Sequence, residues 1–297
     1  MAPISDSPMA IQEASSEQER VAAFMRGWSL EATLPKPAEI EALRQTLPPG
    51  KHIFVSAIPN ESHAHVVESS ILMRRAGFEP IPHVAARNHA DRAALEDMLG
   101  RLHKEAKVSR VLVIGGDRDK PAGPYSDALA VIESGLLQAH GIEEIGIGSY
   151  PDGHPRIGAD DLERALEAKI AAARRAGLKV QLVSQFCFDG ERIIGWLRRL
   201  RANGFTGRIR IGLAGPAKVT TLLRFAQRCG VQASTRGLVR NVGVALQALG
   251  RATPDDIVKM LAEATASGEL GEVSPHFYSF GGFSATARWA SDAEGRH

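Results

Sequence analysis

A short apolar run that ends in two glycines and a carboxylate is the stretch of this sequence best suited to chemistry. Val111 to Ile114 are all aliphatic, and Gly115, Gly116 and Asp117 follow them directly. An uninterrupted apolar run predicts a strand buried on both faces. Two glycines at its end let a ligand approach the backbone closely, with a negative charge beside it. The alternative is a tight turn in which Asp117 caps the next segment.

Polar side chains of similar kind end the other apolar runs. In order they are Glu31, Asn60, His83, Asp117, Tyr150 with His154, Gln185, Gly215-Pro216 and Tyr278. Singly, each has a structural explanation: His83 as a hydrogen-bonded core histidine, Gln185 as a partner of a loop backbone. Together they predict a mouth that binds a polar, planar ligand, with Glu31 and Asp117 divided into one protonated acid and one ionised group. We expect the other histidines of this region (His63, His65, His89 and His103) on the surface.

Apolar or β-branched runs alternate with amphipathic stretches of helical length. The predicted strands are Trp28–Thr33, His52–Pro59, Glu79–Ala86, Arg110–Asp117, Glu144–Pro151, Lys179–Phe186, Arg208–Gly215 and Pro275–Gly281. Predicted helices include Glu61–Ala76, Ala90–Glu105, Asp160–Ala176, Glu191–Asn203 and Val219–Cys229, with two extra helices, Val239–Leu249 and Pro254–Ala266, before the last strand. Eight such alternations without a linker predict a (β/α)₈ TIM barrel as a single domain. A doubly wound open sheet is the alternative, although no GxGxxG follows a strand.

Composition limits the classes of function. The 297 residues are 44% hydrophobic and 24% charged with a net charge of +2, which favours neither nucleic acid nor a membrane surface as partner. Cys187 and Cys229 stand apart without metal-ligand spacing, so we expect no metal site. No signal peptide and no apolar run of membrane-spanning length is found, so we expect a cytoplasmic protein. Residues 1–19 are small and polar and predict a flexible arm; residues 20–297 would form the catalytic barrel.

Eight motifs give the chain a resemblance to a known family. They are SLEATLP, FVSAIP, IPHVAA, VIGGD, SYPDGHP, VSQFCFD, GLAGPA and HFYSF. In their order, spacing and positions at strand ends, the chain resembles the methylenetetrahydrofolate reductases from about Trp28 to Trp289. These are flavin-dependent (β/α)₈ enzymes of one-carbon metabolism that serve methionine biosynthesis.

The resemblance implies roles for individual residues. Glu31 matches the general acid that protonates a folate nitrogen as the imidazolidine ring opens, and Asp117 the carboxylate that favours the iminium cation. Folate contacts would come from Gln185, Phe186 and Tyr278. Cofactor contacts would come from His83, Gly116, Asp117, Tyr150, His154 and Lys169. The implied reaction is ping-pong: NADH or NADPH reduces FAD and leaves, and the reduced flavin passes hydride to the folate methylene carbon.

Three positions that serve flavin in the family differ here. Gly115 stands where an arginine is usual, Ile58-Pro59-Asn60 replaces a threonine with a Gly-Ala turn, and Lys169 fits only if residues 171–174 are an inserted helical turn. Charge-assisted contacts are worth about 1.5–3 kcal/mol each, so we expect weak FAD binding. Two alternatives stay open: a flavin-independent folate enzyme of one-carbon chemistry, and a non-catalytic folate-binding partner subunit. The sequence leaves open whether the chain forms a homo-oligomer.

Overall fold

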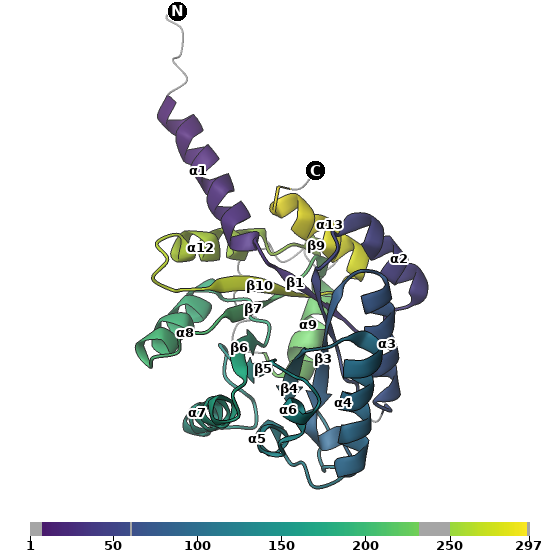
Figure 1. The fold of residues 1–297 in the computed structure, drawn as a ribbon. Coiled ribbons are helices and arrows are strands. Elements are labelled where there is room, and N and C mark those ends of the chain that lie inside the picture. Colours follow the sequence, from purple (N-terminus) through teal and green to yellow (C-terminus); the bar gives the residue numbers. More distant parts are fainter. Residues whose placement is uncertain (1–7, 60, 232–249, 296–297) are drawn as a thin grey trace, which may run out of the picture.

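Eight parallel strands close into a barrel in a computed structural model that describes residues 8–59, 61–231 and 250–295 (Figure 1). Around the barrel the strand order is β1-β10-β7-β6-β5-β4-β3-β2. The strands are β1 (Ser29–Ala32), β2 (His52–Val55), β3 (Glu79–Ala85), β4 (Arg110–Ile114), β5 (Glu144–Ser149), β6 (Lys179–Ser184), β7 (Ile209–Ala214) and β10 (Val273–Tyr278). The predicted (β/α)₈ barrel is therefore confirmed. Most strands end earlier than predicted, so many of the motif residues lie in the loops of the mouth.

Helices surround the barrel. They are α1 (Pro8–Met25), α2 (Pro37–Thr46), α3 (Ala64–Arg75), α4 (Arg92–Ala106), α5 (Ala128–Glu133), α6 (Leu136–Ala139), α7 (Ala159–Arg175), α8 (Gly190–Ala202), α9 (Val219–Cys229), α12 (Asp255–Thr265) and α13 (Phe283–Ala293), with a 3₁₀ turn η1 (Ala86–Asn88). An antiparallel pair, β8 (Ala217–Lys218) and β9 (Arg251–Ala252), adds a small second sheet. Helix α12 occupies the predicted segment 254–266, whereas the predicted helix Val239–Leu249 lies outside the described residues.

The N-terminal segment is helical over much of the predicted arm. Helix α1 includes residues 8–19 of the predicted arm and projects from the barrel beside α12 (Figure 1). Its last turn is anchored because Phe24 and Met25 are buried in the core, while Arg20 pairs with Glu263 of α12 at 2.6 Å. An apolar last turn thus fixes a helix whose earlier part is polar. That residues 1–19 are flexible in solution stays a prediction.

Aspartates start three of the helices that follow strand ends. Asp91, Asp127 and Asp189 each accept a hydrogen bond from the backbone N–H three residues ahead, at 2.8 to 3.1 Å. This is the N-cap bond that satisfies an otherwise unpaired helix donor. The caps fix where α4, α5 and α8 begin, and with them the length of the loops at the mouth.

Side chains alternate between two separate cores along each strand. One set faces the surrounding helices, for example Leu30, Ile53, Val111 and Ile211. The other set fills the barrel, where Phe54, Ile81, Leu112 and Val183 form one apolar layer. Polar groups lie on both sides of that layer: Arg210, Gln181 and His52 towards the N-terminal ends of the strands, and Glu31, His83 and Tyr278 towards the C-terminal ends. Because every second residue of a strand faces the barrel interior, this alternation determines which polar side chains meet at the mouth.

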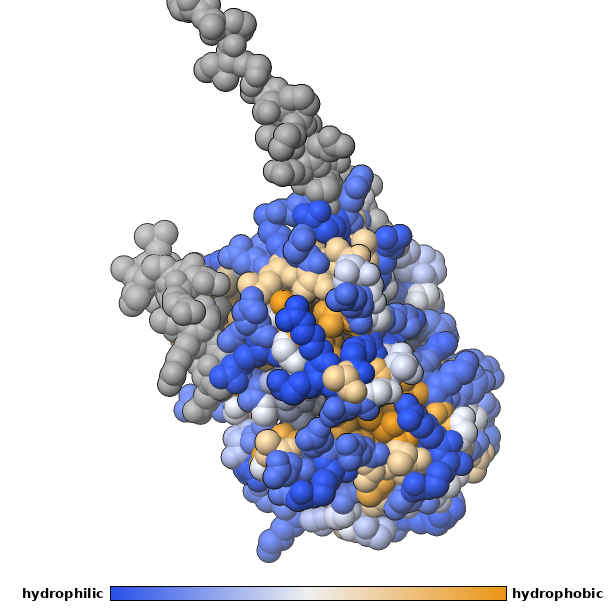
Figure 2. Space-filling view, turned by 90° about the vertical axis from the view of Figure 1, so that its left-hand side faces the viewer, coloured by the Kyte–Doolittle hydropathy of each residue, from blue (hydrophilic) through white to orange (hydrophobic). Residues whose placement is uncertain are grey.

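Figure 2 shows a face that is mostly hydrophilic, with apolar residues mainly in its hollows. Among the described residues, no helix is long and apolar enough to cross a membrane.

Gly212 offers a test of how closely β6 and β7 pack. A Cβ at Gly212 would overlap the Ser184 carbonyl oxygen and lie 2.8 Å from the Phe186 nitrogen, whereas a Cβ at Gly115 meets nothing within 4 Å. We expect Gly212→Ala to lower the free energy of unfolding by about 1–3 kcal/mol, because backbone must move. Gly115→Ala is the matched control and should cause no loss. Urea unfolding of both variants checks this, and equal stability would mean that the strand ends yield easily.

Candidate active site

Glu31 lies at the barrel mouth, enclosed by side chains of three other strands or their ends. Ser56 donates a hydrogen bond to Oε1 at 2.7 Å, and His276 Nε2 lies 3.2 Å from Oε2. His83 Nε2 is 3.6 Å from the same oxygen. The Glu31 side chain is only 12% exposed, and that of His276 is fully buried. The result is a nearly enclosed carboxylate with two histidines beside it.

The surroundings of Glu31 favour its charged form. Burial alone would raise the pKa of Glu31, but its interaction with the His83 ring and the hydrogen bonds from His276 and Ser56 outweigh it and hold the pKa below its usual value. Burial lowers the pKa of both His83 and His276, against the opposing effect of the Glu31 carboxylate. At neutral pH Glu31 is therefore ionised and both rings are neutral. Acting as an acid would require Glu31 to gain a proton first.

Aromatic rings form one wall of the mouth. The Tyr278 ring lies 5.5 Å from that of Phe186 and 5.1 Å from that of His276, and Phe280 stacks beside it at 5.6 Å. Burial raises the pKa of the Tyr278 hydroxyl well above its usual value, so it stays protonated and donates to the Ser184 carbonyl at 3.2 Å. The predicted substrate residues Phe186 and Tyr278 are thus brought together.

Gln185 lies beside this wall but turns towards its own backbone. Its side-chain carbonyl accepts the Phe186 N–H at 3.0 Å. A hydrogen bond to the loop backbone is the structural role expected as the alternative for Gln185. A ligand contact would use the amide NH₂ of the same side chain.

Asp117, Tyr150 and His154 form a second group at the mouth. The rings of Tyr150 and His154 are 5.1 Å apart. Asp117 is exposed, yet close enough to oppose the fall in the pKa of His154 and to add to the burial that raises the pKa of Tyr150. It acts on His83 in the same sense, which connects this group to the Glu31 cluster. Gly116, with φ of 88°, supplies the turn that only glycine adopts readily.

Two positively charged side chains bear on flavin binding, the predicted Lys169 and also Arg87. Arg87 donates to the carbonyls of Ser126 and Arg118 at 2.7 and 3.1 Å, so its guanidinium ties down the loop after β4. Lys169 is half-buried on α7; burial lowers its pKa and the Asp127 carboxylate opposes that change. The open space at Gly115 could admit part of a cofactor, but it brings no charge. The residues present therefore fit the rings of a flavin better than its phosphates.

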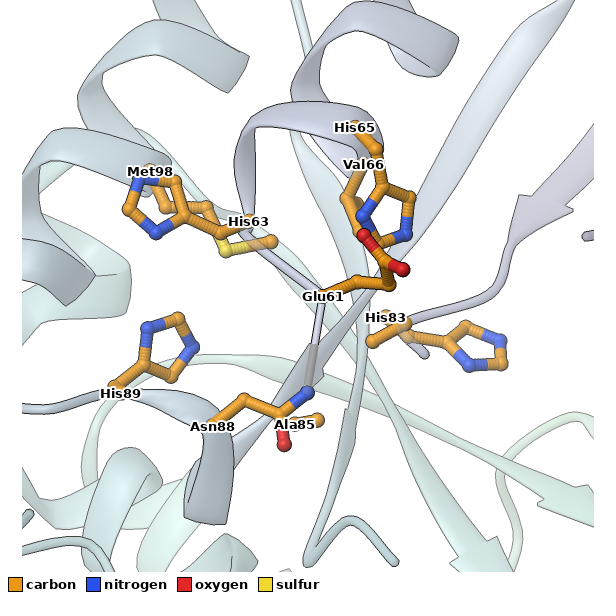
Figure 3. A pocket seen from close by; sticks show the side chains of 10 residues that line it. Glu61, His63, His65, Val66, His83, Ala85, Asn88, His89 and Met98 are labelled. Atoms are coloured by element: carbon orange, nitrogen blue, oxygen red, sulfur yellow. The ribbon is translucent and has the colours of Figure 1, made fainter. Parts of the chain in front are cut away.

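A small hollow adjoins His83 between the β2–α3 loop and η1. It is lined by Ala57, Glu61, His63, His65, Val66, His83, Ala85, Asn88, His89 and Met98. Figure 3 shows His83 and His89 at opposite sides, with Glu61 and Asn88 between them. His89 is only 2% exposed, so its expected surface position is wrong: it follows η1 and turns inward beside His63. Asn60 lies outside the described residues.

Sequence reasoning missed His276 and Ser56 as partners of Glu31. The signal for His276 is its spacing, because residues two apart on a strand share a face and Tyr278 pairs in register with Glu31. Ser56 follows β2 by one residue and carries no such pattern. Within the described ranges, no group of three or more His, Cys, Asp or Glu residues could hold a metal ion.

Buried neutral histidines should make the stability fall in acid. Burial lowers the pKa of His52 and of His89 to about 4, below an unfolded value near 6.5. The unfolded chain thus binds more protons between these values, and stability falls as the pH drops from about 6.5 to about 4. We expect each of these two histidines to lower the free energy of unfolding by about 2 kcal/mol at pH 5 relative to pH 7. Urea unfolding should show a smaller loss for His52→Gln, and an unchanged loss for the exposed-residue control His103→Gln; identical losses in all three proteins would contradict this.

The known proteins that resemble this chain share little sequence identity with it. The chain matches no family model. Dihydropteroate synthase from Thermus thermophilus is 17% identical over 90% of this chain and 91% of its own, with a TM-score of 0.49. A conserved protein of unknown function from Enterococcus faecalis is 12% identical over 64% of this chain, with a TM-score of 0.38. This chain spans about half, 49%, of that protein's length. The architecture is therefore taken from the closed barrel itself.

Proposed function

We propose that this chain is a methylenetetrahydrofolate reductase that works at the barrel mouth. The observation that carries the proposal is the convergence of motifs on one carboxylate. Glu31 belongs to SLEATLP, Ser56 to FVSAIP, His83 to IPHVAA and His276 to HFYSF, and all three neighbours lie within 3.6 Å of Glu31. Motifs far apart in the sequence thus build one site, as the resemblance implies for a folate enzyme.

A planar, polar heterocycle such as a pterin suits this mouth. The aromatic cluster of Phe186, Tyr278 and Phe280 borders the mouth, and the partly exposed rings of Tyr278 and Phe280 offer surface for stacking. Gln185 offers its amide NH₂ beside that cluster. Glu31 and His83 supply hydrogen-bonding groups at the floor of the mouth. A few polar groups beside aromatic rings are typical of sites that fix the orientation of a small molecule.

Glu31 would act as the acid after the substrate covers it. Covering the remaining exposed part of the carboxylate removes water from it, which raises its pKa. Glu31 would then take up a proton when the folate binds, and would donate that proton to the folate nitrogen as the methylene bridge opens. Asp117, exposed at the end of β4, would stabilise the positive charge that develops on the folate, so its effect belongs to the transition state.

FAD is the proposed cofactor, with NADH or NADPH as the reductant. Tyr150, His154, Gly116, Asp117, His83 and Lys169 would hold it. When bound there, FAD would supply the hydride-transfer chemistry between the nicotinamide and the folate. Gly115 brings no cation to this cofactor, so its binding is expected to be weak. We expect the reaction in the cytoplasm, with folate as the small-molecule partner.

The second candidate is a flavin-independent folate reductase of the same fold, favoured by the Arg87 contacts. Because Arg87 is occupied by loop carbonyls, it does not replace the cation absent at Gly115. The visible absorption spectrum of the purified protein separates the two candidates. Reduction of methylenetetrahydrofolate with NADH but without flavin would favour the second. No activity of the isolated chain under either condition would favour a non-catalytic binding subunit.

Glu31→Gln should separate the two half-reactions. We expect flavin reduction by NADH to stay within about twofold, while reduction of methylenetetrahydrofolate falls by about 10²–10⁴-fold, the usual contribution of a general acid. Stopped-flow measurement of each half-reaction checks this. Glu61→Gln is the matched control, because Glu61 is an exposed carboxylate lining the hollow beside His83. Equal losses in both half-reactions of Glu31→Gln would make Glu31 structural.

Gly115→Arg should tighten FAD binding. A new charge-assisted contact to a phosphate corresponds to about a tenfold lower Kd, and a Cβ at Gly115 meets nothing within 4 Å. Equilibrium dialysis or fluorescence quenching of FAD gives the Kd for the unmodified chain, Gly115→Arg and Gly115→Gln. The glutamine variant adds bulk without charge and should not tighten binding. Stoichiometric, tight FAD in the unmodified chain would contradict the expected weakness.

A further inference from the structure

Arg210 is a charged side chain in the interior of the barrel, away from the residues already assigned to the reaction. It is 0% exposed and lies below the Phe54 ring, with its guanidinium carbon 5.7 Å from the ring centre. No ion pair among residues 8–59, 61–231 and 250–295 includes it. Burial lowers the pKa of Arg210 to about 10, so it stays charged at neutral pH. A buried charge is costly unless its hydrogen bonds are made.

Neutral groups satisfy this guanidinium. Nε donates to Gln181 Oε1 at 2.8 Å, and one terminal nitrogen donates to the Gly27 carbonyl at 3.0 Å and to Ser29 Oγ at 3.1 Å. The other terminal nitrogen donates to His52 Nδ1 at 2.7 Å. Arginine has no acceptor, so each of these partners must accept.

The groups at both ends set the direction of the next hydrogen bond. Ser29 Oγ lies 2.9 Å from His276 Nδ1. Ser29 accepts from Arg210 and keeps its single proton to donate, and the ionised Glu31 carboxylate can only accept from the other ring nitrogen, so Ser29 donates to His276 Nδ1. A neutral imidazole that accepts at Nδ1 carries its proton at Nε2. That nitrogen faces Glu31 Oε2 at 3.2 Å.

We propose that Arg210 is a positioning residue for Glu31, acting through Ser29 to fix His276 in the Nε2–H form that donates to the carboxylate. All the donors in this chain of hydrogen bonds point from Arg210 towards Glu31. The arrangement opposes a second proton on His276, because Nδ1 is occupied and the Arg210 charge is near. A proton that enters the cluster therefore binds to Glu31 or His83, which face the mouth, and not to His276. The consequence for catalysis rests on the proposed function; the form of His276 does not.

The other charged and titratable groups around Glu31 and His276 do not replace Arg210. His83, from β3, lies 3.6 Å from Oε2, the same Glu31 oxygen that His276 faces, and has no contact with Nδ1 of His276 among the described contacts. Tyr278, from β10, keeps its proton and donates to the Ser184 carbonyl. Ser56 contacts the other oxygen of Glu31. Only Ser29 links His276 Nδ1 to a charge among the described contacts.

Nitrogen-15 NMR of histidine-labelled protein tests the proposal directly. His276→Gln identifies the signals of His276 by their loss. We expect the Nε2–H form in the unmodified chain. We expect a mixture of forms in Ser29→Ala, where Nδ1 has lost its donor, and in Arg210→Met, where Ser29 no longer accepts from Arg210 and can accept from Nδ1–H instead. The proton affinity of His276 should rise about five- to tenfold in Ser29→Ala, the worth of one hydrogen bond.

Gln181→Met is the matched control, because it removes a partner of Arg210 but leaves Ser29 and His276 in contact. It should lower stability without changing the form or proton affinity of His276. An Nδ1–H form in the unmodified chain, or an unchanged His276 in Ser29→Ala, would overturn the proposal. If folate reduction is found, its pH profile should shift in Ser29→Ala and not in Gln181→Met. If no folate reduction is found, the NMR result still decides the role of Ser29 and Arg210.

Discussion

The small interior of an eight-stranded barrel is the constraint on which this site depends. Only every second side chain of a strand enters that space. In this chain one apolar layer, centred on Phe54 and Ile81, separates two polar groups that would otherwise be hydrated. The carboxylate of Glu31 is on one side and the guanidinium of Arg210 is on the other. Each charge is tolerated because hydrogen-bonding groups enclose it in a place that water hardly reaches.

This arrangement changes how the two carboxylates of the mouth are understood. The sequence favours one protonated acid and one ionised group, since Glu31 and Asp117 end different strands. The structure surrounds Glu31 with donors that stabilise its charge, although burial alone would act in the opposite direction. A carboxylate of this kind serves as an acid only when a bound molecule changes its surroundings. Proton uptake and substrate binding would then be one coupled event.

Much of the fold was predictable because it follows local rules. Apolar runs such as 110–114 and the alternation with amphipathic helices predict the eight strands and their order. Strand ends were placed too late at residues such as Pro59 and Gly281, because loops at the mouth continue apolar runs without pairing. Helix α1 was missed since its anchor, Phe24 and Met25, depends on distant partners. The alternation of strands and helices predicted a single mouth, and the family motifs pointed to Glu31 as a carboxylate in it.

The contacts of Glu31 were predictable only in part. His83 and Tyr278 end strands and were singled out, whereas His276 and Arg210 lie inside strands, where a polar residue has no local signature of its own. Their partners come from other strands, and register determines them. Gln185 illustrates the converse: its position at the end of β6 was predicted, yet its carbonyl turns to the Phe186 backbone. The local sequence pattern predicts where a residue lies, whereas the direction of its hydrogen bonds depends on the assembled barrel.

Pairing of β1 with β10 has a consequence for how the protein is made. Residues 29–31 align with residues 276–278, so the first and last strands of the barrel meet beside Glu31. On a ribosome, β1 emerges long before its neighbour and must wait for about 240 residues of intervening chain. Contacts of such sequence separation form late and slowly, because a long loop must close first. The His276–Glu31 contact therefore matures only when the barrel closes, so partly made chains cannot carry this site.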